Sequence, residues 1–139
     1  MGTNLMRGQQ LLAGLESLPP SIRRLLQRIK KHPSKASDTY YFRSFAQYFD
    51  DAARSMGEIR RVLKPGCCGV VVVQSSYYKN IPIPLGDLYF ALANDLGLVS
   101  KIVLRVPVRR VLATINSRAA RHEPDRHYTE DVLAFQRAA

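Results

Sequence analysis

Glu58-Ile-Arg-Arg-Val-Leu-Lys-Pro-Gly66, followed directly by the apolar run from Cys68 to Val73, decides the fold class of this chain. The first part is typical of the end of an amphipathic helix, which Pro65-Gly66 then stops. The Val-rich run is typical of a β-strand, and its unbroken apolar character predicts burial on both faces. A helix that leads through a tight turn into such a strand predicts an α/β sheet.

Helices are expected upstream of that turn. Residues 37–63 form the strongest one, with Ser37 or Asp38 as its cap and an apolar stripe in steps of three and four: Phe42, Phe45, Phe49, Ala52, Met56, Ile59 and Leu63. In the N-terminal segment a short helix, 9–18, ends at Pro19-Pro20, and a second helix, 22–31, has Ser21 as its cap. We therefore expect a helical N-terminal segment, residues 1–36, and an α/β domain, residues 37–139.

Downstream, the strand ends in polar Gln74-Ser75-Ser76, and a loop over 77–84 leads to a helix that starts after Pro84 and has Gly97 at its C′ position. Strands are expected over 102–108 and 131–136, joined by a long basic stretch without a helix. Strands connected in this way favour an antiparallel pair at the sheet edge. The whole pattern predicts about three strands with helices packed on them.

With these elements placed, the chain resembles a known family. Arg61-Val-Leu-Lys-Pro-Gly66 is similar to the turn before the fifth strand of class I S-adenosylmethionine-dependent methyltransferases. The succession of elements from Tyr40 to Arg137 is most similar to the DNA amino-methyltransferases of the N4-cytosine and N6-adenine type, and Thr129-Glu-Asp-Val-Leu-Ala-Phe135 resembles their seventh strand. The resemblance implies the C-terminal half of a Rossmann-like sheet. It also implies that the intact family methylates an exocyclic amine of a DNA base, as in restriction–modification.

The chain lacks the parts of that family that bind the cofactor and perform the chemistry. No GxG motif occurs in it, and its single Pro-Pro pair lies in Ser17-Leu-Pro-Pro-Ser21, without the aromatic residue of the family's catalytic tetrapeptide. We therefore assign no catalytic or cofactor-binding residue and expect no S-adenosylmethionine binding by this chain alone. It is expected to be a truncated or split part that pairs with a missing N-terminal half or with a second copy of itself.

The balance of charge points to a polyanionic partner. Lys and Arg number 21 against 11 acidic residues, which gives a formal net charge of +10, and such a surface attracts phosphate backbones. DNA is therefore the expected partner. No apolar run approaches the roughly 20 residues of a membrane span, and the N-terminus lacks a signal-peptide core, so a cytoplasmic protein without membrane contact is expected.

Two groups of residues are candidates for nucleic-acid binding. Gln74, Ser75 and Ser76 follow a strand at its carboxyl end, where ligands of open α/β sheets sit, and can hydrogen-bond a base edge. The arginines of the late strand and the basic stretch can hold phosphates: Arg105, Arg109, Arg110, Arg118 and Arg121. The alternative interpretation is a polar strand end and a solvated basic loop.

Other features favour no chemistry. Cys67 and Cys68 are adjacent, without metal-ligand spacing, so we interpret both as reduced structural residues and expect no metal site. Two alternatives to the methyltransferase fragment stay open. One is a non-enzymatic basic nucleic-acid-binding module that reuses the half-sheet, and the other is a fragment of an RNA or small-molecule methyltransferase, which shares the Lys-Pro-Gly turn.

Overall fold

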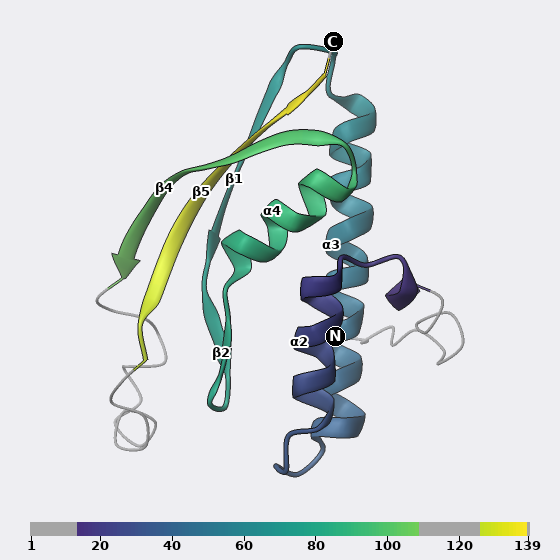
Figure 1. Ribbon diagram of the computed structural model, residues 1–139, viewed down its shortest axis with the longest axis vertical. Coiled ribbons are helices and arrows are strands. Elements are labelled where there is room, and N and C mark those ends of the chain that lie inside the picture. Colours follow the sequence, from purple (N-terminus) through teal and green to yellow (C-terminus); the bar gives the residue numbers. More distant parts are fainter. Residues whose placement is uncertain (1–13, 109–125, 139) are drawn as a thin grey trace, which may run out of the picture.

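The structure, a computed structural model, describes residues 14–108 and 126–138 (Figure 1). These residues form a mixed α/β arrangement with a three-stranded antiparallel sheet. The helical elements are α2 (Pro20–Lys30), the single π-helical turn η1 (Ser37–Tyr41), α3 (Phe42–Val62) and α4 (Leu85–Asp95). The strands are β1 (Cys68–Gln74), β2 (Ser76–Tyr78), β3 (Ile81–Ile83), β4 (Leu98–Val108) and β5 (Tyr128–Arg137).

The main sheet has the order β1-β5-β4, and β5 is antiparallel to both of its neighbours. β1 and β4 therefore run parallel to each other, and the chain passes between them through the β2–β3 hairpin and α4, which packs on all three strands. The antiparallel pairing expected for the last two strands is confirmed. Both strands are longer than expected, because the pairing of β4 with β5 extends to Val108 and Tyr128 at one end and to Leu98 and Arg137 at the other.

The expectation that the Val-rich strand is buried on both faces is wrong. Val70 is 64% exposed and Val72 is 54% exposed, whereas Val71 packs against a buried cluster that contains Leu133 and Phe135. Figure 1 shows α3 and α4 on one side of the sheet and no described element on the other. An apolar run predicts that a strand forms. Whether a second layer covers the other face of that strand depends on the rest of the domain.

The core consists of two adjoining clusters. The larger one joins α2, α3 and the β2–β3 hairpin, with Ile22, Ile29, Phe49 and Ile83 almost fully buried. The smaller one lies between α3, α4 and the main sheet around Met56. The apolar stripe of α3 is confirmed, because its members either belong to these clusters or pack against them.

Three local expectations need correction. Ser37 does not cap a helix: it opens the turn η1, and its hydroxyl donates to the Ser34 carbonyl oxygen and pairs with the Tyr78 hydroxyl at 2.6 Å. α2 begins at Pro20, one of the positions that proline favours at a helix start, and Ser21 Oγ has no hydrogen-bond partner among the described residues. Most of the expected loop 77–84 belongs to the β2–β3 hairpin, which starts at Ser76. Lys79 adopts the left-handed conformation that its tight turn requires.

The turns that punctuate the α/β region behave as expected. Gly66 has φ +76° and Gly97 has φ +71°, the left-handed conformation that glycine adopts without strain. Among the described residues only Ala36 and Lys79 have positive φ without being glycine. Cys67, directly after Gly66, is therefore not strained.

Candidate nucleic-acid interface

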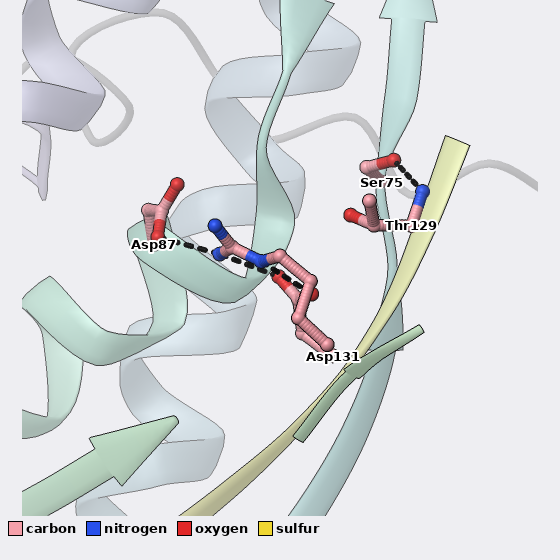
Figure 2. Close-up of polar contacts among 5 residues, drawn as sticks. Ser75, Asp87, Thr129 and Asp131 are labelled. Carbon is pink, nitrogen blue, oxygen red and sulfur yellow. Dashed lines mark hydrogen bonds and ion pairs between the residues drawn. The ribbon is translucent and has the colours of Figure 1, made fainter. Parts of the chain in front are cut away.

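The carboxyl end of β1 meets the start of β5 through a pair of short hydrogen bonds. The Ser75 N–H donates to the Thr129 carbonyl oxygen at 2.7 Å, and the Thr129 N–H donates to Ser75 Oγ at 2.7 Å (Figure 2). The Ser75 hydroxyl thus replaces a backbone acceptor where the chain leaves the main sheet for the hairpin. Gln74 and Ser76, on either side, are exposed. Of the three polar candidates at this strand end, Ser75 is hydrogen-bonded to Thr129, whereas the side chains of Gln74 and Ser76 are exposed to solvent.

A small cavity of about 130 Å³ lies beside this strand end. Its volume is far below the roughly 300–1,000 Å³ of typical ligand pockets. A base that is turned out of the duplex, as enzymes acting on DNA bases require, does not fit in it. The cavity is lined by Ser75, Ser76, Tyr77, Pro82, Ile83, Pro84, His127 and Thr129. Its place at the carboxyl end of β1 matches the position at which open α/β sheets bind ligands.

The two tyrosines of β2 are engaged in packing. The Tyr77 hydroxyl donates to the His127 carbonyl oxygen at 3.1 Å, its ring meets that of Tyr128 edge-on, and the Arg126 guanidinium lies 5.1 Å from its centroid. Tyr78 is buried and bonded to η1. The buried Tyr78 ring is therefore closed to base stacking, and the Tyr77 ring already has Arg126 over it.

Arg105 is held by two carboxylates. Its Nε and Nη2 donate to the two oxygens of Asp131 at 2.8 and 2.9 Å, and Nη2 also donates to Asp87 Oδ1 at 2.8 Å (Figure 2). The hydrogen bonds to Asp131 and then to Asp87 raise the pKa of the Arg105 guanidinium above its usual value. Because two carboxylates outweigh one guanidinium, this cluster attracts phosphate poorly, and it ties β4, β5 and the start of α4 together.

The burial of Asp131 explains why this cluster is so tight. Asp131 is 1% exposed and sits against the first turn of α4. A Cβ added to Gly86 would lie 1.9 Å from Asp131 Oδ2, so only glycine admits the carboxylate there. Register places Arg105 opposite Asp131 in the β4–β5 pairing. The signal in the sequence was an acid in one strand and a base in the next, which acquires meaning only once the register is known.

A second basic surface lies on α2, where it forms one side of a groove. Arg23, Arg24 and Arg28 are exposed, while the opposite face of α2 is buried. Arg24 and Arg28 border a groove of about 320 Å³ between α2 and the segment before α4, lined also by Ser21, Leu25, Pro82, Pro84, Asp87 and Leu88. The groove shares two prolines with the small cavity at the β1 end. Arg24 and Arg28 therefore border a surface that continues toward Ser76.

The remaining candidates are not placed by the structure. Arg109, Arg110, Arg118 and Arg121 lie outside the described residues, as do residues 9–13 of the expected helix 9–18. Residues 14–108 and 126–138 contain no group of three His, Cys, Asp or Glu side chains placed to ligate a metal. No helix in this described part combines the length and apolarity needed to cross a bilayer.

Comparison with known proteins identifies no relative: no family model, curated protein or solved structure matches the chain.

Proposed function

We propose that this chain supplies the C-terminal part of an S-adenosylmethionine-dependent DNA methyltransferase of the amino-methylating type. In this proposal it binds DNA in the cytoplasm, and it contributes neither the cofactor loop nor the catalytic motif. The resemblance of the Arg61–Gly66 turn and of the elements that follow it supports the family. The methyl transfer itself would belong to the complete assembly.

The arrangement of the main sheet is the observation that carries this proposal. β1 and β4 are parallel strands connected through a helix, and β1 has β5 on one side and no described strand on the other. Sheets of the doubly wound class grow by adding parallel strands and cover both faces with helices. The free edge of β1 and the exposed Val70 and Val72 beside it are what a sheet with missing strands and helices would leave uncovered.

Binding of DNA is supported by charge and by position. The chain carries a net charge of +10, and Arg24 and Arg28 of α2 border a groove that leads toward the carboxyl end of β1. Phosphate contacts by such side chains position a protein on the duplex without reading its sequence. Gln74 and Ser76 are exposed at that strand end, where their polar groups can reach a base edge.

Fluorescence anisotropy with a labelled DNA duplex over a series of salt concentrations tests the interface. We expect binding that weakens with salt, and the triple variant Arg23→Ala/Arg24→Ala/Arg28→Ala should reduce the slope of log K against log salt by about 2 to 3, since each phosphate contact contributes about 0.9. A matched control, Arg60→Ala/Arg61→Ala/Lys64→Ala, removes the same charge from the C-terminal end of α3 and the turn after it. Equal effects of the two triple variants would refute the α2 groove as the interface.

A non-enzymatic nucleic-acid-binding module is the second candidate, and the position of the basic groove favours it. α2 lies in the N-terminal segment, which the resemblance does not cover, and yet it supplies the groove's arginines. A neighbouring coding sequence with a glycine-rich loop and a Pro-Pro-Tyr motif would favour the methyltransferase part. DNA binding that persists where no such neighbour exists would favour the module.

A further inference from the structure

The two edge strands of the main sheet differ in how they are protected against pairing with another strand. β4 carries Lys101, Arg105 and Pro107, and its register with β5 shifts between Ile102 and Leu104. Charges, proline and bulges are the features that keep natural edge strands from pairing. β1 has no charged residue, no proline and an unbroken register with β5. The β4 edge is therefore protected against pairing (the blunted edge), whereas the β1 edge can accept another strand (the open edge).

The hydrogen-bonding groups of β1 that face the open edge can be assigned from its flanks. The Ser75 N–H bonds to the Thr129 carbonyl oxygen, and the Arg137 N–H bonds to the Cys67 carbonyl oxygen. Because bonded pairs alternate along an antiparallel ladder, the odd-numbered residues of β1 bond to β5. The N–H and C=O groups of Val70 and Val72 therefore point away from β5, toward the open edge.

We propose that β1 pairs with the β1 strand of a second copy of this chain, antiparallel and about a two-fold axis at Val71. In this register Val70 of one copy lies opposite Val72 of the other, and both have their backbone groups directed at the partner. Residues opposite each other in an antiparallel pair project from the same face, so this register places the exposed faces of the two sheets side by side. The two three-stranded sheets then form one continuous sheet with an isologous interface.

The uncharged sequence of β1 and the exposure of its valines favour a second copy as the occupant. Each copy has a net charge of +10, so copies repel each other in general, but β1 itself brings no like charges together. The pairing places the exposed Val70 and Val72 side chains beside those of the other copy, where β-branched cross-strand pairs stabilise a sheet. Val132 and Ala134 of β5 continue this apolar face within each copy.

A dimer of two positively charged copies held by an uncharged strand should respond to salt in the opposite direction to DNA binding. One strand edge is smaller than the roughly 800 Å² per partner of a standard interface, so we expect a dimer of moderate affinity. Salt screens the repulsion between two positively charged copies, so dimerisation should strengthen as salt rises, whereas DNA binding should weaken. The inference concerns the chain without the missing half, whose strands would occupy the same edge of β1. Dimerisation and DNA binding are measured separately, so the two proposals can fail separately.

Sedimentation velocity of the whole chain over a range of concentrations, at about 50 and 300 mM salt, tests the proposal, with the Debye length falling between these conditions. We expect a dimer that is tighter at the higher salt. Val70→Lys/Val72→Lys should give a monomer with unchanged circular dichroism. Val99→Lys, at a position on β4 that is 66% exposed on the same face but at the blunted edge, should leave the dimer intact.

Amide hydrogen exchange of the unmodified chain gives a second test that needs no variant. The Val70 and Val72 amides should be protected at concentrations where the dimer forms and should exchange rapidly on dilution. A chain that stays monomeric at all concentrations would overturn the proposal. So would equal losses of dimer in the β1 and β4 variants, or rapid exchange of both amides in the dimer.

Discussion

Replacing Arg105 with Leu would leave the carboxylate of Asp131 buried without a cation. Asp131 is 1% exposed, and two nitrogens of Arg105 donate to its two oxygens. Removing one partner of a buried ion pair costs about 3–5 kcal/mol, because the remaining charge is neither paired nor hydrated. Since the Arg105 side chain is 43% exposed, we expect the lower end, a loss of about 3 kcal/mol in the free energy of unfolding. In a domain of this size that corresponds to a fall of about 10 °C in Tm.

Urea unfolding followed by circular dichroism measures this loss, and two further variants isolate its cause. Asp87→Asn removes the exposed partner of Arg105, which is 52% exposed, and should cost less than about 1 kcal/mol. Arg105→Leu/Asp131→Asn removes the stranded charge and should be more stable than Arg105→Leu alone by at least about 1 kcal/mol. The reasoning is refuted if Arg105→Leu costs no more than Asp87→Asn, or if the double variant is less stable than the single one.

Two further predictions concern packing and a buried hydroxyl. Gly86→Ala would put its new carbon 1.9 Å from Asp131 Oδ2 and should cost about 2 kcal/mol or more, whereas Gly57→Ala, with nothing within 4 Å, should stabilise α3 by up to about 1 kcal/mol; equal effects in urea unfolding would contradict this account. Tyr78→Phe removes a buried hydroxyl bonded across 2.6 Å to η1 and should cost about 1–2 kcal/mol. Tyr40→Phe, at a position 58% exposed, is its control, and a similar loss there would argue against a role for that bond.

Patterns carried by one element were predictable from the sequence. The apolar stripe of α3 was placed correctly, because helical spacing alone determines which side chains share a face. The turn at Pro65-Gly66 and the end of α4 at Gly97 were also predictable, since positive φ favours glycine. The β2–β3 hairpin was missed, because Ile81-Pro82-Ile83 contains a proline and its turn uses Lys79 in place of glycine.

Features that depend on how elements meet were not predictable. The exposed face of β1 reflects the lack of a described helix on that side of the sheet, which no property of a Val-rich run reveals. The ion pairs of Arg105 follow from the β4–β5 register, and the groove beside Arg24 follows from the docking of α2 near the segment before α4. Among the predicted site residues, Ser75 and Arg105 prove to have structural partners, and the four arginines from 109 to 121 stay predictions.

The central claim is that this chain carries part of a methyltransferase sheet and interface but not the cofactor site. Isothermal titration of the purified chain with S-adenosylmethionine, alone and with duplex DNA present, tests it most directly. The account predicts heat when DNA is added and none when the cofactor is added under either condition. Micromolar binding of S-adenosylmethionine would contradict it, because a chain without the glycine-rich loop would then hold a complete cofactor site.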